Sequence, residues 1–358
     1  MNAKSELKAI DFFCGAGGMT YGLSQAGIKV LAGIDIDETC KETYELNNPG
    51  SKFIHADIRN FTVQELKQLT RIKRNDDSLV FIGCSPCQYW TKINTDKNKS
   101  EDTKDLLSEF QRFVKYFRPG YIVIENVPGL YKKRDENTLS PFLEFLEKES
   151  YYYDHGLVNA NRLGVPQHRI RYLLIGSRLS ENINLPEEEE DETLVLKNFL
   201  GEKNGFPKVC AGHRDKTDFI HTVASLSEKN KKRIELTPKN GGNRLSWKDH
   251  PELQINTYRG KDHIFKDVYG RMSWDKPAPT ITTRFNSLSN GRFGHPEENR
   301  AISLREGATL QSFPKTYKFV SANMATIARH IGNAVPPEMA KRIGLVILKN
   351  IRRDQHER

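Results

Sequence analysis

Short apolar runs and stretches with helical spacing alternate through the first 180 residues of the chain. Apolar residues recur at helical intervals in segments such as Thr62–Leu69 and Leu106–Phe117, which separate the runs. Strands that alternate with helices form a mostly parallel sheet covered by helices. The expected strands are Lys8–Phe13, Val30–Ile34, Leu79–Ile82, Tyr121–Ile124 and Tyr172–Ile175. The sequence therefore predicts an α/β fold for this part of the chain.

The second half of the chain has a different pattern. The acidic run Glu187–Thr193 follows a proline and is typical of a linker or an exposed loop. Residues 195–300 are rich in Gly, Asn, Pro, Arg and Trp, and no helix longer than about two turns is predicted there. Short strands are expected near Thr280–Thr283, and a helix is expected over Met339–Ile351. The predicted domains are a large one formed by residues 1–180 and 326–358 and a small, loop-rich one formed by residues 181–325.

The net charge of +9 is carried by the second half of the chain. Residues 1–200 contain 26 Lys and Arg against 30 Asp and Glu, whereas residues 201–358 contain 29 against 16. A basic region joined to a slightly acidic one is typical of a protein that binds a polyanion. A solvated, lysine-rich surface would have the same composition, so the charge alone leaves both interpretations open.

The cysteine content and the hydropathy indicate a soluble intracellular protein. The five cysteines are an odd number at irregular spacing, and no secretion signal is recognised in the sequence. No apolar run reaches the roughly 20 residues that a membrane helix needs. We therefore expect a reduced, cytoplasmic setting and no membrane association.

A glycine-rich turn joins the first expected strand to a helix. Gly15, Gly17 and Gly18 let the backbone approach a ligand closely, and the start of the helix adds N–H donors. Asp35 ends the second expected strand, where a carboxylate can accept from ribose hydroxyls, and Asp57 ends a third. A turn of this kind can also be purely structural. With an acid after each of the next two strands, the pattern favours a nucleoside-containing cofactor in a Rossmann-like crevice.

Two cysteines follow the strand that ends at Ile82. Cys84 and Cys87 have the spacing of half a zinc site or of a redox pair. A zinc site needs a second pair or histidines at ligand spacing, and the chain has neither, so no metal is expected. A redox pair opens a helix in a small thioredoxin-like unit, which this chain does not resemble. The remaining interpretation is a nucleophilic thiol at the carboxyl edge of the sheet.

Polar residues follow the next strands along the chain. Glu125 ends the strand Tyr121–Ile124, and the carboxyl ends of parallel strands meet at one edge, so Glu125 and Cys87 are expected to share a pocket. Gln167, Arg169 and Arg171 alternate before the last strand and are expected on one face, where two guanidiniums can bind an anion. Taken alone, Glu125 is an ordinary cap residue and the arginines a charged edge strand.

Six motifs in this order resemble the motif series of the DNA (cytosine-5) methyltransferases. The resemblance spans nearly the whole chain, and the chain length resembles that of the stand-alone bacterial enzymes of restriction–modification systems. The motifs are Phe13-x-Gly15-x-Gly17-Gly18, Pro86-Cys87-Gln88, Glu125-Asn126-Val127, Gln167-x-Arg169-x-Arg171, Arg305-Glu306 with Gln311-x-Phe313-Pro314, and Gly332-Asn333-Ala334-Val335. The resemblance implies an S-adenosylmethionine-dependent methyltransferase domain of Rossmann-like fold with a smaller, loop-rich target-recognition domain.

The resemblance also implies catalytic roles. Carbon 5 of cytosine is a poor nucleophile, and addition of the Cys87 thiolate to carbon 6 makes it an enamine carbon that can accept a methyl group. Glu125 would protonate ring nitrogen 3 or donate a hydrogen bond to it. Arg169 would hold the carbonyl oxygen of the base and orient Glu125, with Arg171 nearby. The sequence does not identify the base that removes the carbon-5 proton.

The cofactor S-adenosylmethionine would be held by residues of the same motifs. Phe13 would stack on the adenine with Ile36 opposite, Asp35 would hold the ribose hydroxyls, and Asp57 the adenine amino group. Ile36 departs from the aromatic residue that the family often has there. The remaining cofactor residues implied by the resemblance are Gly15, Gly17, Gly18, Ile58, Pro86 and Asn333.

The implied substrate is double-stranded DNA, whose target base the family flips into the pocket. The basic region 195–300 lies where the family has its recognition segment, and residues Tyr89–Ser100 resemble the loop that closes over the flipped base. The arginines expected to read bases are Arg214, Arg244, Arg271, Arg284 and Arg292. We expect a monomer and a partner restriction endonuclease that acts on the same site.

Four alternatives compete with this interpretation. A tRNA cytosine-5 methyltransferase shares most of the motifs, but that branch carries a Cys-Phe-Thr signature that this chain lacks. A non-catalytic relative would not need Cys87, Glu125 and both arginines. A Rossmann dehydrogenase would explain the glycine turn but not Pro86-Cys87-Gln88. A solitary DNA methyltransferase with a regulatory role has the same motifs as a restriction–modification enzyme.

Overall fold

The computed structural model describes residues 6–85, 105–133, 138–258 and 263–356. The chain divides into two compact units, which we call unit 1 and unit 2. Unit 1 comprises residues 1–163, 170–189 and 335–358, and unit 2 comprises residues 164–169 and 190–334. Residues 164–169 and 326–334, which the sequence assigned to the large domain, fall in unit 2, and residues 181–189, which it assigned to the small domain, fall in unit 1.

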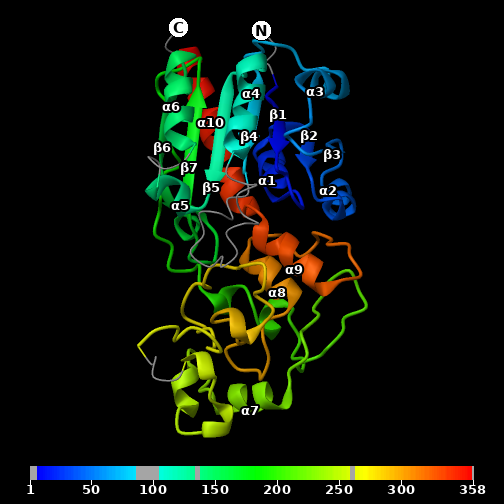
Figure 1. Ribbon diagram of the computed structural model, residues 1–358, viewed down its shortest axis with the longest axis vertical. Helices are drawn as coiled ribbons and strands as arrows, with labels where there is room; N and C mark the ends of the chain where they lie inside the picture. Colours follow the sequence, from blue (N-terminus) through cyan, green and yellow to red (C-terminus); the bar gives the residue numbers. More distant parts are fainter. Residues whose placement is uncertain (1–5, 86–104, 134–137, 259–262, 357–358) are drawn as a thin grey trace. The chain divides into compact units, whose positions relative to one another are not determined.

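Unit 1 is built on a seven-stranded sheet (Figure 1). Its strands are β1 (Lys8–Phe12), β2 (Lys29–Asp35), β3 (Lys52–His55), β4 (Leu79–Gly83), β5 (Tyr121–Asn126), β6 (Tyr152–Asn159) and β7 (Ile170–Ser177). They lie in the order β3-β2-β1-β4-β5-β7-β6, in which β1 to β5 pair in parallel and β7 is antiparallel to both β5 and β6. The α/β sheet that the sequence predicts is confirmed.

Helices connect the strands of unit 1 and cover the sheet. They are α1 (Gly18–Ala26), α2 (Lys41–Asn47), α3 (Val63–Thr70), α4 (Leu106–Phe117), α5 (Pro128–Lys132), α6 (Leu139–Lys148) and α10 (Pro337–His356). Helix α1 packs so closely against α10 that a Cβ at Gly22 would lie 2.2 Å from the carbonyl oxygen of Pro337. Across the described part of the chain, we find no helix with the length and apolarity needed to span a membrane.

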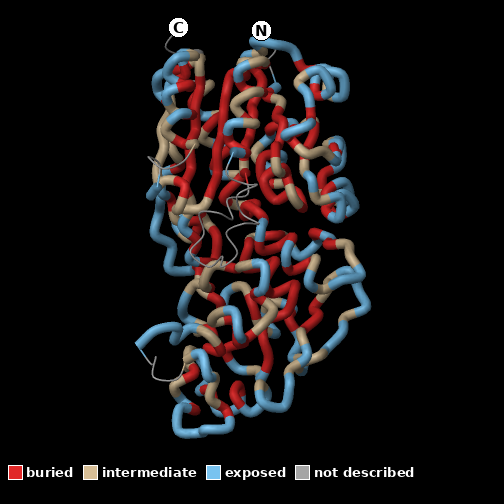
Figure 2. Tube along the Cα trace, viewed as in Figure 1, coloured by how far each residue is buried: buried red, intermediate tan, exposed pale blue. Residues whose placement is uncertain are grey.

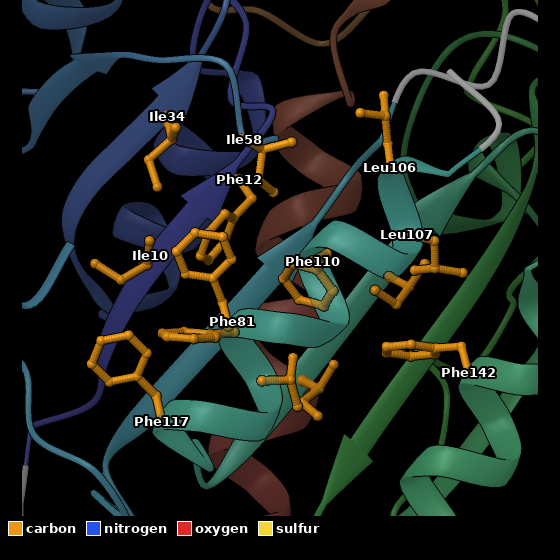
Figure 3. Packing of buried hydrophobic residues seen from close by; sticks show 14 of the residues in the cluster. Ile10, Phe12, Ile34, Ile58, Phe81, Leu106, Leu107, Phe110, Phe117 and Phe142 are labelled. Atoms are coloured by element: carbon orange, nitrogen blue, oxygen red, sulfur yellow. The ribbon is translucent and has the colours of Figure 1, made fainter. Parts of the chain in front are cut away.

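Phenylalanines fill the space between the sheet and helix α4 (Figure 3). The ring of Phe12 on β1 lies 5.2 Å from that of Phe81 on β4 and 5.0 Å from that of Phe113 on α4, centroid to centroid. Such pairs stabilise the fold beyond the burial of their area, by about 1 kcal/mol each. The cluster holds β1 and β4 together at the edge where the glycine turn and the segment leading to Cys87 begin.

Unit 2 contains little regular structure. Its helices are α7 (Glu228–Leu236), α8 (Leu304–Leu310) and α9 (Met324–Asn333), and short single turns and loops make up most of its other described residues. Figure 2 shows that many of these irregular segments are buried. Loops with buried backbone need hydrogen-bond partners other than those of helices and sheets.

Two predictions for this region were wrong. Helix α7 has nine residues, and the sequence did not indicate it because its residues are almost all polar; Ser227 caps it by accepting from the N–H of Asn230. The strands expected near Thr280–Thr283 do not form. Only an isolated parallel bridge between Gln167 and Ala278 lies beside that segment.

Candidate functional site

The glycine-rich turn lies at the carboxyl end of β1, in unit 1. Gly15 and Gly17 have positive φ of 50° and 89°, and Phe13 before them has a φ of 65°. A Cβ on Gly15 would meet no other atom within 4 Å, so the turn borders open space. The N–H groups of Phe13 and Cys14 donate to the carbonyl oxygen of Ile34 and fix the turn to β2. The turn therefore leaves room where a ligand can approach the backbone.

Asp35 closes the side of this turn. Its two carboxylate oxygens accept from the N–H of Gly15 at 2.8 Å and from the N–H of Asp37 at 2.8 Å. Burial raises the pKa of Asp35, although these two backbone donors counteract the effect. Ile36, next along the chain, is 58% exposed, which is unusual for a large apolar residue. An exposed isoleucine beside a carboxylate and an open turn is suited to packing against an adenine ring.

Asp57 and Ile58 follow β3 and differ in their surroundings. The Asp57 carboxylate accepts from the backbone N–H and the guanidinium of Arg59, whose Nη2 lies 2.7 Å from Oδ2, and these bonds lower the pKa of Asp57. Ile58 is buried in the phenylalanine cluster. Its side chain thus packs in the core, and only its backbone can face a ligand.

Glu125, at the end of β5, is paired with an arginine of the neighbouring strand. The Nε of Arg171 on β7 lies 3.2 Å from Oε1 of Glu125, and both side chains are largely buried. The geometry is that of an ion pair without a hydrogen bond, because Oε1 accepts none within the described residues. Burial lowers the pKa of Arg171, and the carboxylate opposes this shift. Oε1 of Glu125 therefore remains available to a further hydrogen-bond partner.

Asn126 connects this strand end to the segment before the expected nucleophile. Its Nδ2 donates to the carbonyl oxygen of Ser85 at 3.0 Å and to the Ser85 hydroxyl at 3.2 Å. Ser85 precedes Cys87 by two residues in the sequence. Pro86, Cys87 and the loop Tyr89–Ser100 lie outside the described residues. The described contacts thus hold the chain next to Cys87 at the strand end that carries Glu125.

The other cysteine of the Cys84-x-x-Cys87 pattern is described. Burial raises the pKa of the Cys84 thiol well above its usual range, and the charges of Glu125 and Asp11 raise it further. A thiol in this environment stays protonated and is a poor nucleophile. Cys84 is therefore unsuited to the nucleophilic role that the sequence assigned to Cys87.

The two arginines of the Gln-x-Arg-x-Arg motif have different partners. Strand β7 begins at Ile170, so the expected alternation does not include Gln167 and Arg169. Arg169 is buried in unit 2, where it donates to the carbonyl oxygens of Ile281, Gly332 and Ala334 at 3.0, 3.3 and 3.1 Å. The guanidinium beside Glu125 belongs to Arg171, whereas the sequence assigned this position to Arg169.

Gln167 forms a buried polar cluster with the segment around Gln311. Its Nε2 donates to the carbonyl oxygen of Leu310 and to Oε1 of Gln311, and its Oε1 accepts from the N–H of Ile281. Gln311 donates in turn to the carbonyl oxygen of Ile331 at 2.6 Å, within α9. Asn333, the last residue of α9, is exposed. The side chains of Gln167 and Gln311 thus hold segments inside unit 2 together by hydrogen bonds, whereas Asn333 is accessible to solvent.

The sequence did not single out Asp11, a buried carboxyl group beneath the glycine turn. Its Oδ2 accepts from the Thr20 hydroxyl at 2.7 Å, and Thr20 contacts the Tyr44 hydroxyl at 3.0 Å. Its Oδ1 is buried without a hydrogen-bond partner in the described part of the chain. Burial raises the pKa of Asp11 to about 7. An acid inside an otherwise apolar strand was the available signal, because such a residue is rarely buried without a specific reason.

The five arginines expected to face DNA do not form one class. Arg244 and Arg271 are buried, and each donates to carbonyl oxygens of loops in unit 2. Arg214 donates to the carbonyl oxygen of Val223, and Arg292 pairs with Asp267. Arg284 is exposed and makes no side-chain hydrogen bond or ion pair within the described residues. The prediction that Arg244 and Arg271 read bases was wrong, because their guanidiniums are enclosed by the fold.

A family model for C-5 cytosine-specific DNA methylases matches residues 7–349. The chain belongs to this family. It is 37% identical over 350 residues to the type II methylase M.HgiDII of Herpetosiphon aurantiacus, covering 96% of this chain and 94% of that protein. It is 30% identical over 354 residues to the type II methyltransferase M1.BsuMI of Bacillus subtilis (strain 168), covering 94% and 79%.

Solved structures support the same fold for this methyltransferase. The first is described as a DNA modification methyltransferase encoded within an E. coli prophage, and it matches with a TM-score of 0.73 at 21% identity, over 97% of this chain and 100% of that one. The methyltransferase EhMeth of Entamoeba histolytica matches with a TM-score of 0.64 at 16% identity, over 97% and 99%. The chain is thus a DNA cytosine-5 methyltransferase with a Rossmann-like α/β domain, and the dehydrogenase alternative is excluded.

Proposed function

We propose that this enzyme transfers the methyl group of S-adenosylmethionine to carbon 5 of cytosine in a specific double-stranded DNA sequence, through a covalent adduct with Cys87. The observation that carries the proposal is the strand end at Glu125. A buried Glu–Arg pair and an asparagine that anchors the chain before Cys87 meet there. Nucleophile, proton carrier and cation are the groups that this reaction needs.

The glycine turn fits the cofactor by its shape and its donors. Gly15 borders open space, and a side chain there would take up that space. Asp35 would accept from the ribose hydroxyls, Asp57 from the adenine amino group, and Phe13 with Ile36 would enclose the adenine ring. Gly17 and Gly18 would surround the methionine end. Bound there, the cofactor supplies an electrophilic methyl group, while the chain supplies position and an enclosed site.

Glu125 and Arg171 would act on the cytosine ring. The Cys87 thiolate forms a bond to carbon 6 while ring nitrogen 3 receives a proton from Glu125, which leaves carbon 5 electron-rich. Carbon 5 would then take the methyl group, with the demethylated cofactor as the leaving group. The carbon-5 proton would leave to a base, the proton on ring nitrogen 3 would return to Glu125, and the double bond would re-form as the thiolate is expelled. Arg171 would hold Glu125 in position and stabilise the carbonyl oxygen of the base. We assign this role to Arg171 because its Nε is 3.2 Å from Glu125.

Unit 2 would bind the DNA. It contains 25 Lys and Arg against 16 Asp and Glu, whereas unit 1 contains 30 of each. The entire net charge of the chain therefore belongs to unit 2, which suits contact with phosphates. The target base would be flipped out of the duplex, because carbon 6 is not accessible to a thiolate inside the stack.

The similarity to type II methylases indicates the biological role. M.HgiDII and M1.BsuMI carry names of type II enzymes, and the chain covers most of the length of both. We propose that this enzyme protects the DNA of a bacterial cell from a restriction endonuclease with the same target, and that it acts in the cytoplasm as a monomer.

The test is transfer of tritiated methyl from S-adenosylmethionine to unmethylated DNA, with tRNA as a second substrate. Label on carbon 5 of cytosine in DNA is the expected result. Glu125→Gln should lower the rate by on the order of 10²-fold or more, and Glu144→Gln, at an exposed position of α6, should leave it unchanged. Label on tRNA alone would contradict the choice of substrate, and full activity of Glu125→Gln would contradict the mechanism.

A further inference from the structure

A short turn joins β3 to α3 in unit 1 and carries Asp57. We call residues Asp57–Phe61 the Asp57 turn. The N–H groups of Asn60 and Phe61 donate to the carbonyl oxygen of Asp57 at 3.0 and 2.9 Å, which closes the turn. Ile58 and Phe61 are buried, whereas the two residues between them are exposed. The turn thus has one side in the core and one side toward solvent.

One side chain of α4 contacts both ends of the buried side. Nη2 of Arg112 donates to the carbonyl oxygen of Ile58 at 2.8 Å and to that of Phe61 at 3.0 Å. Ile58 is joined directly to Asp57, so a displacement of its carbonyl group displaces the Asp57 side chain as well. Arg112 therefore determines where the Asp57 carboxylate lies.

Arg112 is itself held in one orientation. Its Nε and Nη2 donate to Oε2 of Glu109, one turn earlier on α4, at 3.2 and 3.1 Å. Its guanidinium carbon lies 4.6 Å from the ring centroid of Phe113. A planar guanidinium that is fixed by a carboxylate and by an aromatic ring loses little further freedom when it binds the turn. It is therefore a rigid support.

The aromatic packing between the Asp57 turn and α4 does not provide the same restraint. The rings of Phe61 and Phe113 are stacked, with centroids 6.0 Å apart. Apolar contact is non-directional, whereas hydrogen bonds from one nitrogen to two carbonyl oxygens fix the turn along the helix. The Arg112 side chain is 39% exposed, so water can bind the two carbonyl groups in its absence. We therefore expect the loss of Arg112 to affect the position of Asp57 more than the stability of the fold.

We propose that Arg112 is a positioning residue for the cofactor, because it holds the Asp57 turn where the Asp57 carboxylate can accept from the adenine amino group. The proposal rests on the proposed function, in which Asp57 makes that contact. Arg112 acts through the turn and takes no part in bond making. Its loss should weaken the binding of adenosyl compounds and raise the KM for S-adenosylmethionine, while kcat at saturating cofactor stays the same.

The first test is the affinity for S-adenosylhomocysteine, measured by isothermal titration calorimetry. Arg112→Met should raise its Kd by on the order of 10-fold, the size expected when a hydrogen bond to a charged group is weakened. Arg112→Lys should stay within about 3-fold of the wild type, because a single ammonium nitrogen has enough donors for both carbonyl oxygens.

A second ligand separates the position of Asp57 from general damage to the site. It is the analogue of S-adenosylhomocysteine with hydrogen in place of the adenine amino group. The wild type should bind the analogue more weakly by on the order of 10-fold, because Asp57 has no donor to accept from. Arg112→Met should raise the Kd of the analogue by at most about 2-fold, because the contact that Arg112 supports is missing in both proteins.

Arg74→Met is the matched control. Arg74 donates from Nε to the carbonyl oxygen of Tyr116 at 2.8 Å and lies 4.9 Å from the centroid of that ring, so it makes the same kinds of contact one turn further along α4. It should leave both affinities unchanged, and thermal unfolding of all variants should be close to that of the wild type.

Three outcomes would overturn the role of Arg112 and leave the proposed methyl transfer intact. They are an equal loss of Arg112→Met for both ligands, no loss for either, and a wild-type protein that binds both ligands equally well. A wild-type protein that binds neither S-adenosylmethionine nor S-adenosylhomocysteine would overturn the proposed function and the role of Arg112 with it.

Discussion

The two units satisfy their buried backbone in different ways. In unit 1, seven strands and the helices around them pair most of the backbone groups, and the interior is apolar. In unit 2, arginine side chains replace this pairing. Apart from Arg171, which pairs with Glu125, the buried arginines within the described residues lie in unit 2, and each donates to at least one backbone carbonyl. They are Arg169, Arg233, Arg244, Arg271, Arg300 and Arg305.

This difference changes how the charge of the molecule is interpreted. Unit 2 has a net charge of +9, but these six of its cations are internal supports and are not available to a phosphate. The number of arginines in the sequence cannot show which of them support buried loops and which bind phosphates, since both roles require the same residue type. The lesson is that positive charge in a loop-rich unit indicates scaffold as well as a nucleic-acid surface.

The units also treat buried acids differently. Asp11 in unit 1 is buried with no cation of the described chain segments among its contacts, and burial raises its pKa to about 7. Glu306 in unit 2 is buried against Arg300, with Nη1 to Oε2 at 2.7 Å, and this pairing holds its pKa at about 2. One acid is neutral over much of the pH range and the other is ionised, which follows from the presence of a partner.

The largest expected effect is on the scaffold of unit 2. Arg271 donates to the carbonyl oxygens of Thr237, His295, Glu298 and Ile234 and to the side chain of Asn299. Arg271→Met leaves these acceptors buried without a donor, and we expect the free energy of unfolding to fall by about 5 kcal/mol. Urea unfolding followed by the fluorescence of the buried Trp247 measures this in unit 2.

If Arg271→Met unfolded at the same midpoint urea concentration as the wild type, buried arginines would not be what stabilises the loops of unit 2. Arg284→Met serves as its control, because it removes an arginine of the same unit whose guanidinium is exposed. That variant should unfold like the wild type.

The next effect concerns Asp11 and rising pH. Its pKa lies above the unfolded value of 3.8, so the folded state binds the extra proton. Its contribution to stability is complete below pH 3.8 and is lost as the pH rises to about 7, amounting to about 4 kcal/mol. Asp11→Asn should remove this slope in unfolding curves recorded between pH 4 and pH 8. An unchanged slope in the variant would mean that Asp11 is ionised in the folded state.

Glu306 should give the opposite sign at acid pH. Its folded pKa of about 2 lies below the unfolded value of 4.5, so its contribution is complete above pH 4.5 and is lost as the pH falls through about 2. The loss amounts to about 3 kcal/mol. Glu306→Gln should already be destabilised at pH 7 and should lose less on acidification than the wild type. Equal acid sensitivity of the two proteins would rule out Glu306 as its source.

The smallest effect tests which cations remain for DNA. Arg284→Ala should weaken binding to a duplex by about 1 kcal/mol and reduce the slope of log affinity against log salt by about 1. Lys73→Ala removes an exposed cation from unit 1 and should change neither quantity. Titrations at several salt concentrations decide the question. If Lys73→Ala weakened binding as much as Arg284→Ala, cations of unit 1 would contribute to DNA binding as much as those of unit 2.

The strands that were predicted correctly from the sequence include those that are buried almost throughout. Strands β4 and β5 are buried along their whole length and β1 is buried apart from Lys8, so their apolar runs were recognisable. Strand β6 was not predicted because most of its residues are partly exposed, and its pattern matches neither a buried nor a half-buried strand. The antiparallel direction of β7 has no local signal, since direction depends on how the chain crosses the sheet.

The candidate site shows the same limit. Asp35 and Glu125 were found because they end apolar strands, which is a local feature. The different partners of Arg169 and Arg171 could not be predicted, because strand β7 begins between them and only the fold determines that boundary. The anchoring of Ser85 by Asn126 joins residues that are 41 positions apart, and no spacing in the sequence indicates it.

The most direct test of the proposed mechanism is the mass of the complex formed with a duplex that carries 5-fluorocytosine at the target position. Fluorine cannot leave as a cation, so methyl transfer from S-adenosylmethionine should stop at the covalent adduct. We predict one adduct of protein, DNA and methyl group in the wild type and in Cys84→Ser, and none in Cys87→Ser, with the modified peptide containing Cys87. An adduct that persists in Cys87→Ser and disappears in Cys84→Ser would contradict the mechanism.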